Sequence, residues 1–342
     1  MSTIETRSRA DILKYSRTVG MCTMDGRGFY CPVDTAIGKD GRLYVVNRSV
    51  ENYFSGVRVS MLNMEGEYFD HFGSYGDGDG QFTWASCAAV DSQGRIYVSD
   101  EYANRISVFD ASGGFLSRWG VSGNSEGGLD GPSGVAFDGE DNLYVSDTHN
   151  NRIQKFTKDG QFLVAFGSKG DGDGKLNLPW GVVVGPNGDV YVADWGNDRI
   201  QRFSHDGRYL AKYGAPGRGD GQFHRPSGVA VDGQGYMYVA DWGNERIQVL
   251  DPDGRFVLKN RGESTLSRWA EDYLNTNVEE AEARDRANLE PEIEYDVDDP
   301  HEESSHIEKY FWSPVSIKLD GTGSLYVTEG NRHRIQVFQT GH

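Results

Sequence analysis

Four side chains in this sequence could move a proton or hold an anion: those of Tyr30, His149, His224 and Arg225. A phenol or an imidazole can act as a general acid or base, and a guanidinium can hold a carboxylate or phosphate through two parallel hydrogen bonds. We predict that Tyr30 or His224 transfers a proton while Arg225 holds an anionic group. For each histidine taken alone, an exposed or ordinarily hydrogen-bonded side chain is the simpler interpretation.

Six further residues are candidates for substrate binding, and five of them are tryptophans. They are Trp84, Trp180, Trp195, Trp242, Trp312 and Asn177. Because indole is costly to leave in water, tryptophans that gather on one side of a protein indicate an apolar cleft, a docking surface, or packing beneath another segment.

The element that must position these residues is a repeat. The segment RPSGVAVDGQGYMYVADWGNERIQVLDPDG begins at Arg225, and related segments begin at Gly131 and Leu178. Each copy contains short alternating or β-branched runs separated by Asp-Gly or Asn-Gly turn signals, and a further run follows, which predicts four strands per unit. The arginine that opens the third strand recurs every 47 residues and then once after 88: Arg58, Arg105, Arg152, Arg199, Arg246 and Arg334.

Six such units predict an all-β fold, a six-bladed β-propeller. A four-stranded sheet cannot bury both of its faces alone, so the units pack side by side around an axis. Residues 10–20 resemble a fourth strand without its first three, and the sixth unit ends after its third strand. We therefore expect the N-terminal strand to close the ring, which removes exposed sheet edges. Residues 1–342 then form a single domain.

The repeat motifs P-x-G-V-A-x-D, L-Y-V-x-D, N-x-R-I-Q-x-F and G-D-G-Q-F resemble the NHL repeat over nearly the whole chain. The resemblance implies the six-bladed fold but no single activity, because NHL propellers include RNA-binding regulators, bacterial sensor domains and a peptidyl-hydroxyglycine amidating lyase. That lyase binds zinc through histidines just after the repeat proline. Here those positions hold no histidine: they are Val33, Ser86, Ser133, Trp180, Ser227 and Val315. The lyase's zinc site is therefore not implied, although these residues should ring the mouth of the axial channel.

Strand order assigns the candidate residues to one face. The loops that enter the first strands and the loops between second and third strands lie on the same side, which we call the top rim. An acidic insertion, residues 261–312, falls between blades 5 and 6 and must rise from this rim. Residues 264–289 are predicted to be helical. We expect the insertion to form a lid over the channel mouth.

A divalent cation is a further hypothesis for the channel. Three converging imidazoles would hold Zn²⁺, and axial carboxylates or carbonyls would hold Ca²⁺. No two histidines have a diagnostic spacing, since His301 and His306 are five residues apart. We therefore assign no metal ligands and keep calcium or zinc on the propeller axis as the cofactor hypothesis.

Charge and composition exclude some partners. The formal net charge is -18, whereas nucleic-acid binding draws most of its affinity from a basic face, so we expect no nucleic-acid partner. No apolar run approaches the roughly 20 residues of a membrane span, so we expect no membrane partner. Residues 1–10 lack the apolar core of a signal peptide, and Cys22, Cys31 and Cys87 are irregularly spaced. These features predict a cytoplasmic protein.

Two functions from different classes fit these observations. The first is a small-molecule lyase or hydrolase that acts in a lidded aromatic pocket at the top of the channel, with a metal ion as an optional aid. The second is a non-catalytic propeller whose aromatic top face binds a protein or peptide. We favour a small-molecule ligand, because a lid closed over a pocket suits the first function and an open flat face suits the second.

Overall fold

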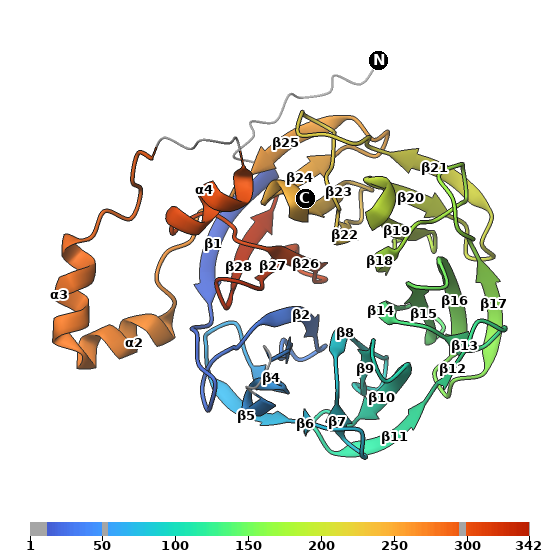
Figure 1. The fold of residues 1–342 in the computed structure, drawn as a ribbon, viewed down its shortest axis with the longest axis horizontal. Coiled ribbons are helices and arrows are strands. Elements are labelled where there is room, and N and C mark those ends of the chain that lie inside the picture. The colour runs from blue at the N-terminus through green and yellow to red at the C-terminus, as the bar shows by residue number, and fades with distance from the viewer. Residues whose placement is uncertain (1–11, 50–53, 294–298, 342) are drawn as a thin grey trace.

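The computed structural model describes residues 12–49, 54–293 and 299–341, and these form six four-stranded antiparallel sheets around a central axis (Figure 1). The predicted all-β, six-bladed propeller is confirmed. Blades 1 to 3 comprise β2 (Pro32–Ile37), β3 (Leu43–Asn47), β4 (Arg58–Leu62) and β5 (Tyr68–Phe72); β8 (Ala85–Val90), β9 (Ile96–Asp100), β10 (Arg105–Phe109) and β11 (Phe115–Trp119); and β14 (Pro132–Phe137), β15 (Asn142–Asp147), β16 (Arg152–Thr157) and β17 (Phe162–Phe166). Blades 4 and 5 comprise β18 (Pro179–Val184), β19 (Val190–Asp194), β20 (Arg199–Phe203) and β21 (Tyr209–Tyr213); and β22 (Gly228–Val231), β23 (Met237–Asp241), β24 (Arg246–Leu250) and β25 (Phe256–Asn260).

Blade 6 is assembled from both ends of the chain. It contains β26 (Pro314–Leu319), β27 (Ser324–Glu329), β28 (Arg334–Thr340) and, on its outer edge, β1 (Leu13–Val19). β1 pairs antiparallel with β28, so that Leu13 lies opposite Thr340 and Val19 lies opposite Ile335. The predicted closure by the N-terminal strand is therefore confirmed. Without β1, the backbone edge of β28 would be unpaired.

Short elements decorate the loops. Two-stranded parallel pairs join β6 (Ser74–Tyr75) to β7 (Gln81–Phe82) and β12 (Val121–Ser122) to β13 (Gly128–Leu129). Single turns of 3-10 helix on the top rim are η1 (Phe54–Gly56), η2 (Trp195–Asn197) and η3 (Trp242–Asn244). The described helices of the insertion are α2 (Arg268–Thr276), α3 (Val278–Arg286) and α4 (Pro300–His306).

The recurring arginines are structural. Four form short ion pairs of 2.7 to 2.8 Å with the carboxylate that ends the second strand: Arg152 with Asp147, Arg199 with Asp194, Arg246 with Asp241, and Arg334 with Glu329. Arg199 also donates to the backbone carbonyls of Asp171 (2.7 Å) and Lys175 (2.8 Å). Each such arginine therefore ties the loop that enters its blade to the second strand, through charge-assisted hydrogen bonds.

The insertion is helical where predicted, but α2 and α3 lie outside the ring beside β1 rather than over the channel (Figure 1). The expected lid is corrected for this part of the insertion. The physical reason is Trp269, which is buried against Phe29 (ring centroids 5.5 Å) and Tyr68 (6.1 Å) and donates its indole N–H to the Gly66 carbonyl. The indole finds its apolar environment at the outer edge of blades 6 and 1.

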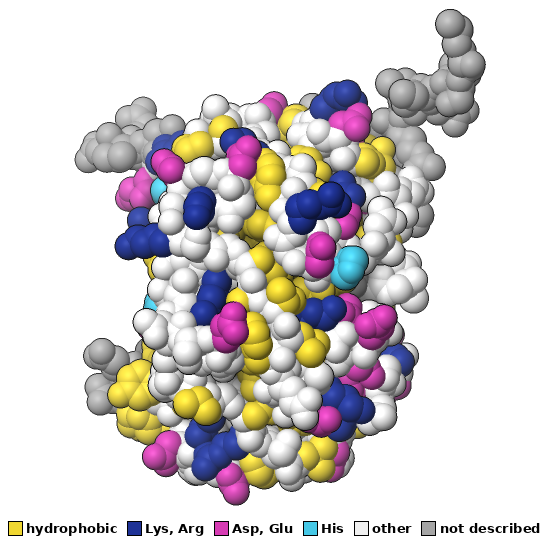
Figure 2. Space-filling view, turned by 90° about the vertical axis from the view of Figure 1, so that its right-hand side faces the viewer, with side chains coloured by type: hydrophobic (Ala, Val, Ile, Leu, Met, Phe, Trp, Pro, Cys, Tyr) yellow, Lys and Arg dark blue, Asp and Glu magenta, His cyan; other side chains and the backbone are white. Residues whose placement is uncertain are grey.

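The described outer surface around blades 2 and 3 has no large patch of a single charge (Figure 2). Figure 2 views the ring from the side of β12, β13 and β17, and acidic and basic side chains are scattered there among hydrophobic ones. No helix among the described residues combines the length and apolar character that a membrane span requires. The inner strands of the described blades enclose a cavity along the axis of the ring, and this directs attention to those strands.

Candidate functional site

The inner strands of the six blades surround an axial cavity of about 330 Å³. As the sequence predicts, residues one position after the repeat proline line this cavity, in five of the six blades: Val33, Ser86, Trp180, Ser227 and Val315. The sixth, Ser133, is buried and forms a hydrogen bond with the hydroxyl of Thr148 (2.6 Å). Most of the other lining side chains are apolar, so the few polar side chains among them are conspicuous.

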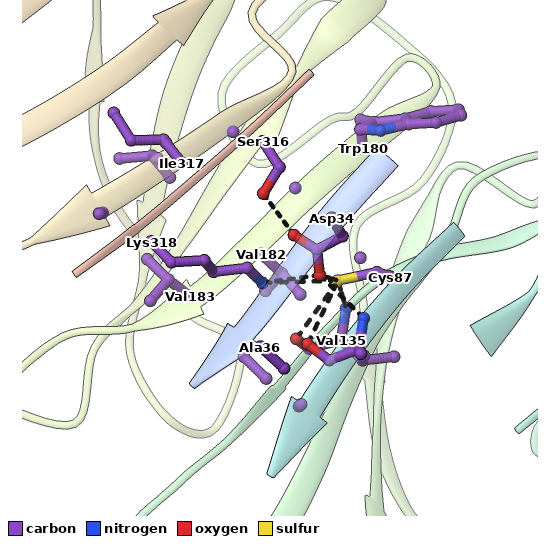
Figure 3. Close-up of a pocket in the computed structure, with 18 of the residues that line it drawn as sticks. Asp34, Ala36, Cys87, Val135, Trp180, Val182, Val183, Ser316, Ile317 and Lys318 are labelled. Atoms are coloured by element: carbon purple, nitrogen blue, oxygen red, sulfur yellow. Dashed lines mark hydrogen bonds and ion pairs between the residues drawn. The ribbon is translucent and has the colours of Figure 1, made fainter. Parts of the chain in front are cut away.

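A polar cluster lies within the cavity between blades 6, 1 and 2 (Figure 3). The Asp34 carboxylate accepts hydrogen bonds from the Cys87 thiol (2.8 Å), from the Ala88 backbone N–H (2.8 Å) and from the Ser316 hydroxyl. The Lys318 ammonium lies 3.3 Å from Asp34 Oδ2 and 3.5 Å from Cys87 Sγ. Strands β2, β8 and β26 position these groups, and Trp180 lies at the far end of the view, away from Lys318.

The protonation states in this cluster follow from burial and charge. Burial, together with the negative charge of Asp34, raises the pKa of the Cys87 thiol to about 12. Burial alone would lower the pKa of Lys318, but the attraction of Asp34 outweighs it and raises that pKa above its ordinary value. At neutral pH the cluster therefore consists of a thiol, an ammonium and a hydroxyl that all donate to one carboxylate.

The site residues predicted from the sequence do not include this cluster, although the repeat contains a signal for it. Two positions after the repeat proline, blades 3, 4 and 5 have glycine, whereas blades 1, 2 and 6 have Asp34, Cys87 and Ser316. Four positions after it, the other blades have alanine or valine and blade 6 has Lys318. Comparison of these two positions across the blades would have identified all four residues.

The donor set does not fit the calcium or zinc hypothesis. Among the described residues, no three His, Cys, Asp or Glu side chains are grouped so that they could hold a metal ion. Asp34 is the one carboxylate in the described lining of the cavity, and its oxygens already accept from three donors and face an ammonium. An ammonium beside the carboxylate would repel a cation, so we derive no chemistry through a metal.

The fold distributes the predicted proton-transfer residues around the rim. Tyr30 precedes blade 1, His149 lies between the second and third strands of blade 3, and His224 precedes blade 5, so they do not form one cluster. The Tyr30 ring stacks on His333 (5.4 Å, 2°), and this histidine was not among the predicted residues. His149 Nδ1 lies 3.2 Å from Asp130. His224 Nδ1 lies 3.6 Å from Asp198, and about half of its side chain is exposed.

Three of the predicted tryptophans form an arc along the top rim of blades 4 to 6. The Arg225 guanidinium lies over the Trp195 ring (4.7 Å), and Trp195 packs on Trp242 (6.4 Å). Trp242 donates its indole N–H to the Ser313 hydroxyl (2.7 Å), the residue that follows Trp312. The structure thus brings Arg225 together with the arc.

The other predicted binding residues lie apart from the arc. Trp180 lies in the cavity, the Trp84 ring on blade 2 lies under the Arg48 guanidinium (4.8 Å), and the Asn177 side chain donates to the Gly196 carbonyl (3.1 Å).

A second repeated contact latches neighbouring blades together at this rim. The residue before the recurring arginine accepts a hydrogen bond, at 2.6 to 3.0 Å, from the backbone N–H that precedes the next blade's proline: Asn104 from Gly131, Asn151 from Leu178, Asp198 from Arg225, Glu245 from Ser313, and His333 from Cys31. Burial raises the pKa of Glu245 to about 7 and lowers the pKa of His333. Glu245 also accepts from His301 of α4, whose other ring nitrogen accepts from Trp312 (3.1 Å).

The chain is similar to two protein families. The family described as SMP-30/Gluconolactonase/LRE-like region matches residues 88–220, and the NHL repeat matches residues 223–250 and 311–338. No curated protein matches the chain in sequence.

Solved structures resemble the whole fold. A streptogramin B lyase structure superposes with a TM-score of 0.56 at 15% identity, covering 98% of this chain and 100% of that chain. A catalytically inactive virginiamycin B lyase from Staphylococcus aureus with quinupristin gives 0.57 at 13% identity, covering 96% and 99%. A protein of unknown function from Bacteroides thetaiotaomicron gives 0.61 at 17% identity, covering 96% and 75%. At these identities the likeness shows the fold alone.

The family matches, the recurring motifs and the blades agree with one another. The NHL matches coincide with blades 5 and 6, and the gluconolactonase-like match extends from blade 2 through blade 4. The recurring strands, arginine ties and rim latches extend the same unit around the ring. The chain is a six-bladed β-propeller that carries NHL repeats in blades 5 and 6 and resembles the NHL-repeat propellers.

Proposed function

We propose that the protein is a small-molecule lyase or hydrolase whose substrate binds at the top of the axial channel. The observation that carries this proposal is the cavity of about 330 Å³, which lies within the size range of small-ligand sites. The side chains that line it are mostly apolar, with Trp180 near one end and a compact polar cluster inside. An apolar wall with a few convergent polar groups is typical of a pocket that binds and orients a small molecule.

The rim supplies the remaining parts of the proposal. Arg225 is exposed and rests on Trp195, so its guanidinium is available to an anionic group of a ligand. His224 is its neighbour in sequence and is about half exposed, which leaves its imidazole free to exchange a proton with a bound molecule. In this proposal the rim captures the ligand and the channel orients its reacting end.

Two compounds test the activity. Gluconolactone is suggested by the matching gluconolactonase-like family, and quinupristin is suggested by the similar virginiamycin B lyase structure. Hydrolysis of gluconolactone releases a proton and can be followed with a pH indicator. Quinupristin can be followed by mass spectrometry, in which a hydrolase adds the mass of one water and a lyase adds none. We expect turnover of at least one compound, and we expect replacement of Trp180 by Ser, the residue of blades 2, 3 and 5 at this position, to lower the rate at least about tenfold.

A matched control separates the channel from general effects of losing an indole. Trp119 lies in an outer strand, where blades 1 and 3 carry Phe72 and Phe166 at the same position. The Trp119→Phe variant should therefore keep the wild-type rate. Equal rates for Trp180→Ser and the wild type would place the reaction outside the channel.

A second candidate function is peptide or protein binding, and one observation favours it. Since α2 and α3 lie outside the ring, they do not cover the arc of Trp195, Trp242 and Trp312, and the part of the insertion that reaches it is α4, whose His301 contacts Trp312. A half-buried aromatic arc with arginines stacked on it suits a docking surface. The two functions differ in their dependence on the arc. Loss of binding to an immobilised peptide library in a Trp242→Ala variant, without turnover of either compound, would favour the docking function.

A further inference from the structure

Two charged side chains face each other in the axial cavity. Among the described residues that line it, Asp34 and Lys318 are the only charged ones. They come from different blades, and their closest atoms are 3.3 Å apart. Any ligand that enters this apolar channel therefore meets one cation and one anion, and the exposure of each decides which of them it contacts.

The cation faces the cavity and the anion does not. The Lys318 side chain is 26% exposed, whereas the Asp34 side chain is 2% exposed. Asp34 is also saturated, because its two oxygens accept from Cys87, Ala88 and Ser316 in addition to Lys318. Lys318 has three N–H donors, and its contacts with Asp34 and the Cys87 sulfur use two of them. The group of the cluster that can bind a ligand is therefore the third N–H of the positively charged Lys318 ammonium.

The propeller fold itself does not require this pair. Blades 3, 4 and 5 build the same part of the axis with glycine two positions after the proline and with alanine or valine four positions after it. Burying an ion pair costs desolvation that the mutual attraction barely offsets, so such a pair contributes little to stability compared with apolar packing. Stability alone therefore does not account for a charged pair at this place on the axis.

Cys87 is not the reacting group of this cluster. Its pKa is raised to about 12 by burial and by the charge of Asp34, so it is held as a thiol, whereas a nucleophilic cysteine needs a thiolate. The thiol instead helps to hold Asp34, and Asp34 holds Lys318 in its protonated form. Cys87, Ser316 and Asp34 are thus positioning residues, and Lys318 is the group they present to the cavity.

We propose that Lys318 is the anion-binding group of the axial channel and that it takes the carboxylate of a small ligand whose apolar part lies against the channel wall toward Trp180. The same ammonium would stabilise the negative oxygen that develops when an ester or lactone carbonyl reacts, because a fixed positive donor in an apolar cavity favours charge that appears there. This inference deepens the proposed function, but it concerns binding and can be tested without a known reaction.

Three probes of one shape and different charge test the sign of the site. Benzoate, benzamide and benzylammonium can be compared by isothermal titration calorimetry with the full chain. We expect benzoate to bind at least about tenfold more tightly than either of the others. Preference for benzylammonium would show that Asp34 is the ligand-facing charge, and equal binding of benzoate and benzamide would show that charge is not recognised. Either result, or no benzoate binding at millimolar concentration, would overturn the proposal.

Variants then assign the binding to Lys318. Lys318→Met should lower benzoate affinity at least about tenfold, and Lys318→Arg should keep most of it. Because Lys318→Met leaves Asp34 buried without a cation, the double variant Asp34→Asn with Lys318→Met removes both charges and should show the same loss in a well-folded protein. Retained benzoate affinity in the double variant would overturn the proposal. Lys155→Met is the matched control, since Lys155 forms a partly buried ion pair with Asp138 (2.8 Å) outside the channel lining.

The outcomes distinguish this inference from the proposed function. Benzoate binding that depends on Lys318, without turnover of gluconolactone or quinupristin, would keep the anion site and argue against the enzyme. Turnover that is unchanged in Lys318→Met would keep the enzyme and remove Lys318 from its site.

Discussion

The axis of this propeller is built in two different ways. In blades 3 and 4, a glycine two positions after the proline lets each inner strand approach the backbone of the next: a Cβ added to Gly134 would lie 2.4 Å from the Trp180 carbonyl oxygen, and one added to Gly181 would lie 2.6 Å from that of Ser227. In blades 6, 1 and 2 the same position carries Ser316, Asp34 and Cys87, and a hydrogen-bonded network fills the space.

The difference teaches that close backbone contact and a polar network are alternative ways to fill the centre of one ring. Close contact leaves no side chain to face the cavity at that level, since a glycine has none. The network fills the same level with side chains and presents an ammonium to the cavity. The chemistry of the channel is therefore confined to blades 6, 1 and 2, and the remaining blades supply wall and rim.

The largest effect should come from the strand that closes blade 6. Blades 1 to 5 are built from four consecutive strands, whereas blade 6 depends on β1. Removal of residues 1–20 should leave β28 with an unpaired edge and expose its buried neighbours, so we expect aggregation or loss of the cooperative thermal transition. Size-exclusion chromatography and thermal melting would measure this. A truncated protein that melts like the full chain would show that the ring does not need β1.

The glycine half of the axis should be intolerant of a single added methyl group. Gly181→Ala places a Cβ against the Ser227 carbonyl oxygen, and we expect it to lower the free energy of unfolding by about 1–3 kcal/mol. Gly139→Ala is the control, because nothing lies within 4 Å of its added Cβ, and it should change stability by less than about 0.5 kcal/mol. Chemical denaturation would measure both. Equal stability of the two variants would mean that the inner strands can separate without cost.

The hydrogen bonds that link neighbouring blades at the rim also differ between blades. Asn104 and Asn151 accept them through neutral amides, whereas Glu245 accepts through a carboxylate. Because folding raises the pKa of Glu245 from 4.5 to about 7, the folded state disfavours the carboxylate, and its contribution to stability falls as pH rises between these values. Glu245→Gln removes this dependence. Its stability relative to the wild type should therefore increase with pH by up to about 1.4 kcal/mol per unit between about pH 4.5 and 7.

Denaturation curves across this pH range would measure the effect. His333 acts in the opposite sense, since its lowered pKa makes stability fall as pH drops below its ordinary value, but it is present in both proteins and cancels in the difference. Glu279→Gln on the exposed face of α3 is the control variant. A pH-independent difference between Glu245→Gln and the wild type would contradict the burial of this carboxylate.

The smallest effect on stability is expected at the predicted rim site. Replacing His224 and Arg225 with Asn and Leu gives blade 5 the residues that blade 4 carries at Asn177 and Leu178. Both side chains are exposed, so the double variant should unfold within about 0.5 kcal/mol of the wild type. Its turnover or ligand affinity should nevertheless fall at least about tenfold. Unchanged turnover would return both residues to a purely structural role.

Much of the fold was predictable because its unit is repeated. The arginine series set the number of blades, the turn signals set four strands in each, and the strand at residues 13–19 was recognisable as a fourth strand without its first three. The ion pairs of Arg152, Arg199, Arg246 and Arg334 were predictable for the same reason. A local pattern that recurs six times is six independent observations of one structure.

The candidate site was predictable only in part. The residues one position after the proline line the cavity as expected, because strand direction alone assigns them to the top of the inner strands. Tyr30, His149 and His224 were grouped by residue type and rim, but the fold places them on alternate blades. The order of the strands predicts which residues lie on the top rim. It does not predict which of those residues lie close to one another around the rim.

The tertiary structure decided which side chains meet on the axis. Inner strands of a propeller are covered on both faces, so alternation of apolar and polar residues does not show which side chain points to the cavity. Asp34, Cys87 and Lys318 meet because ring closure brings blades 6, 1 and 2 side by side, although blades 6 and 1 lie at opposite ends of the repeat array. The position of α2 was decided in the same way, since Trp269 packs where Phe29 and Tyr68 leave an apolar site, and neither the repeat nor the insertion encodes that contact locally.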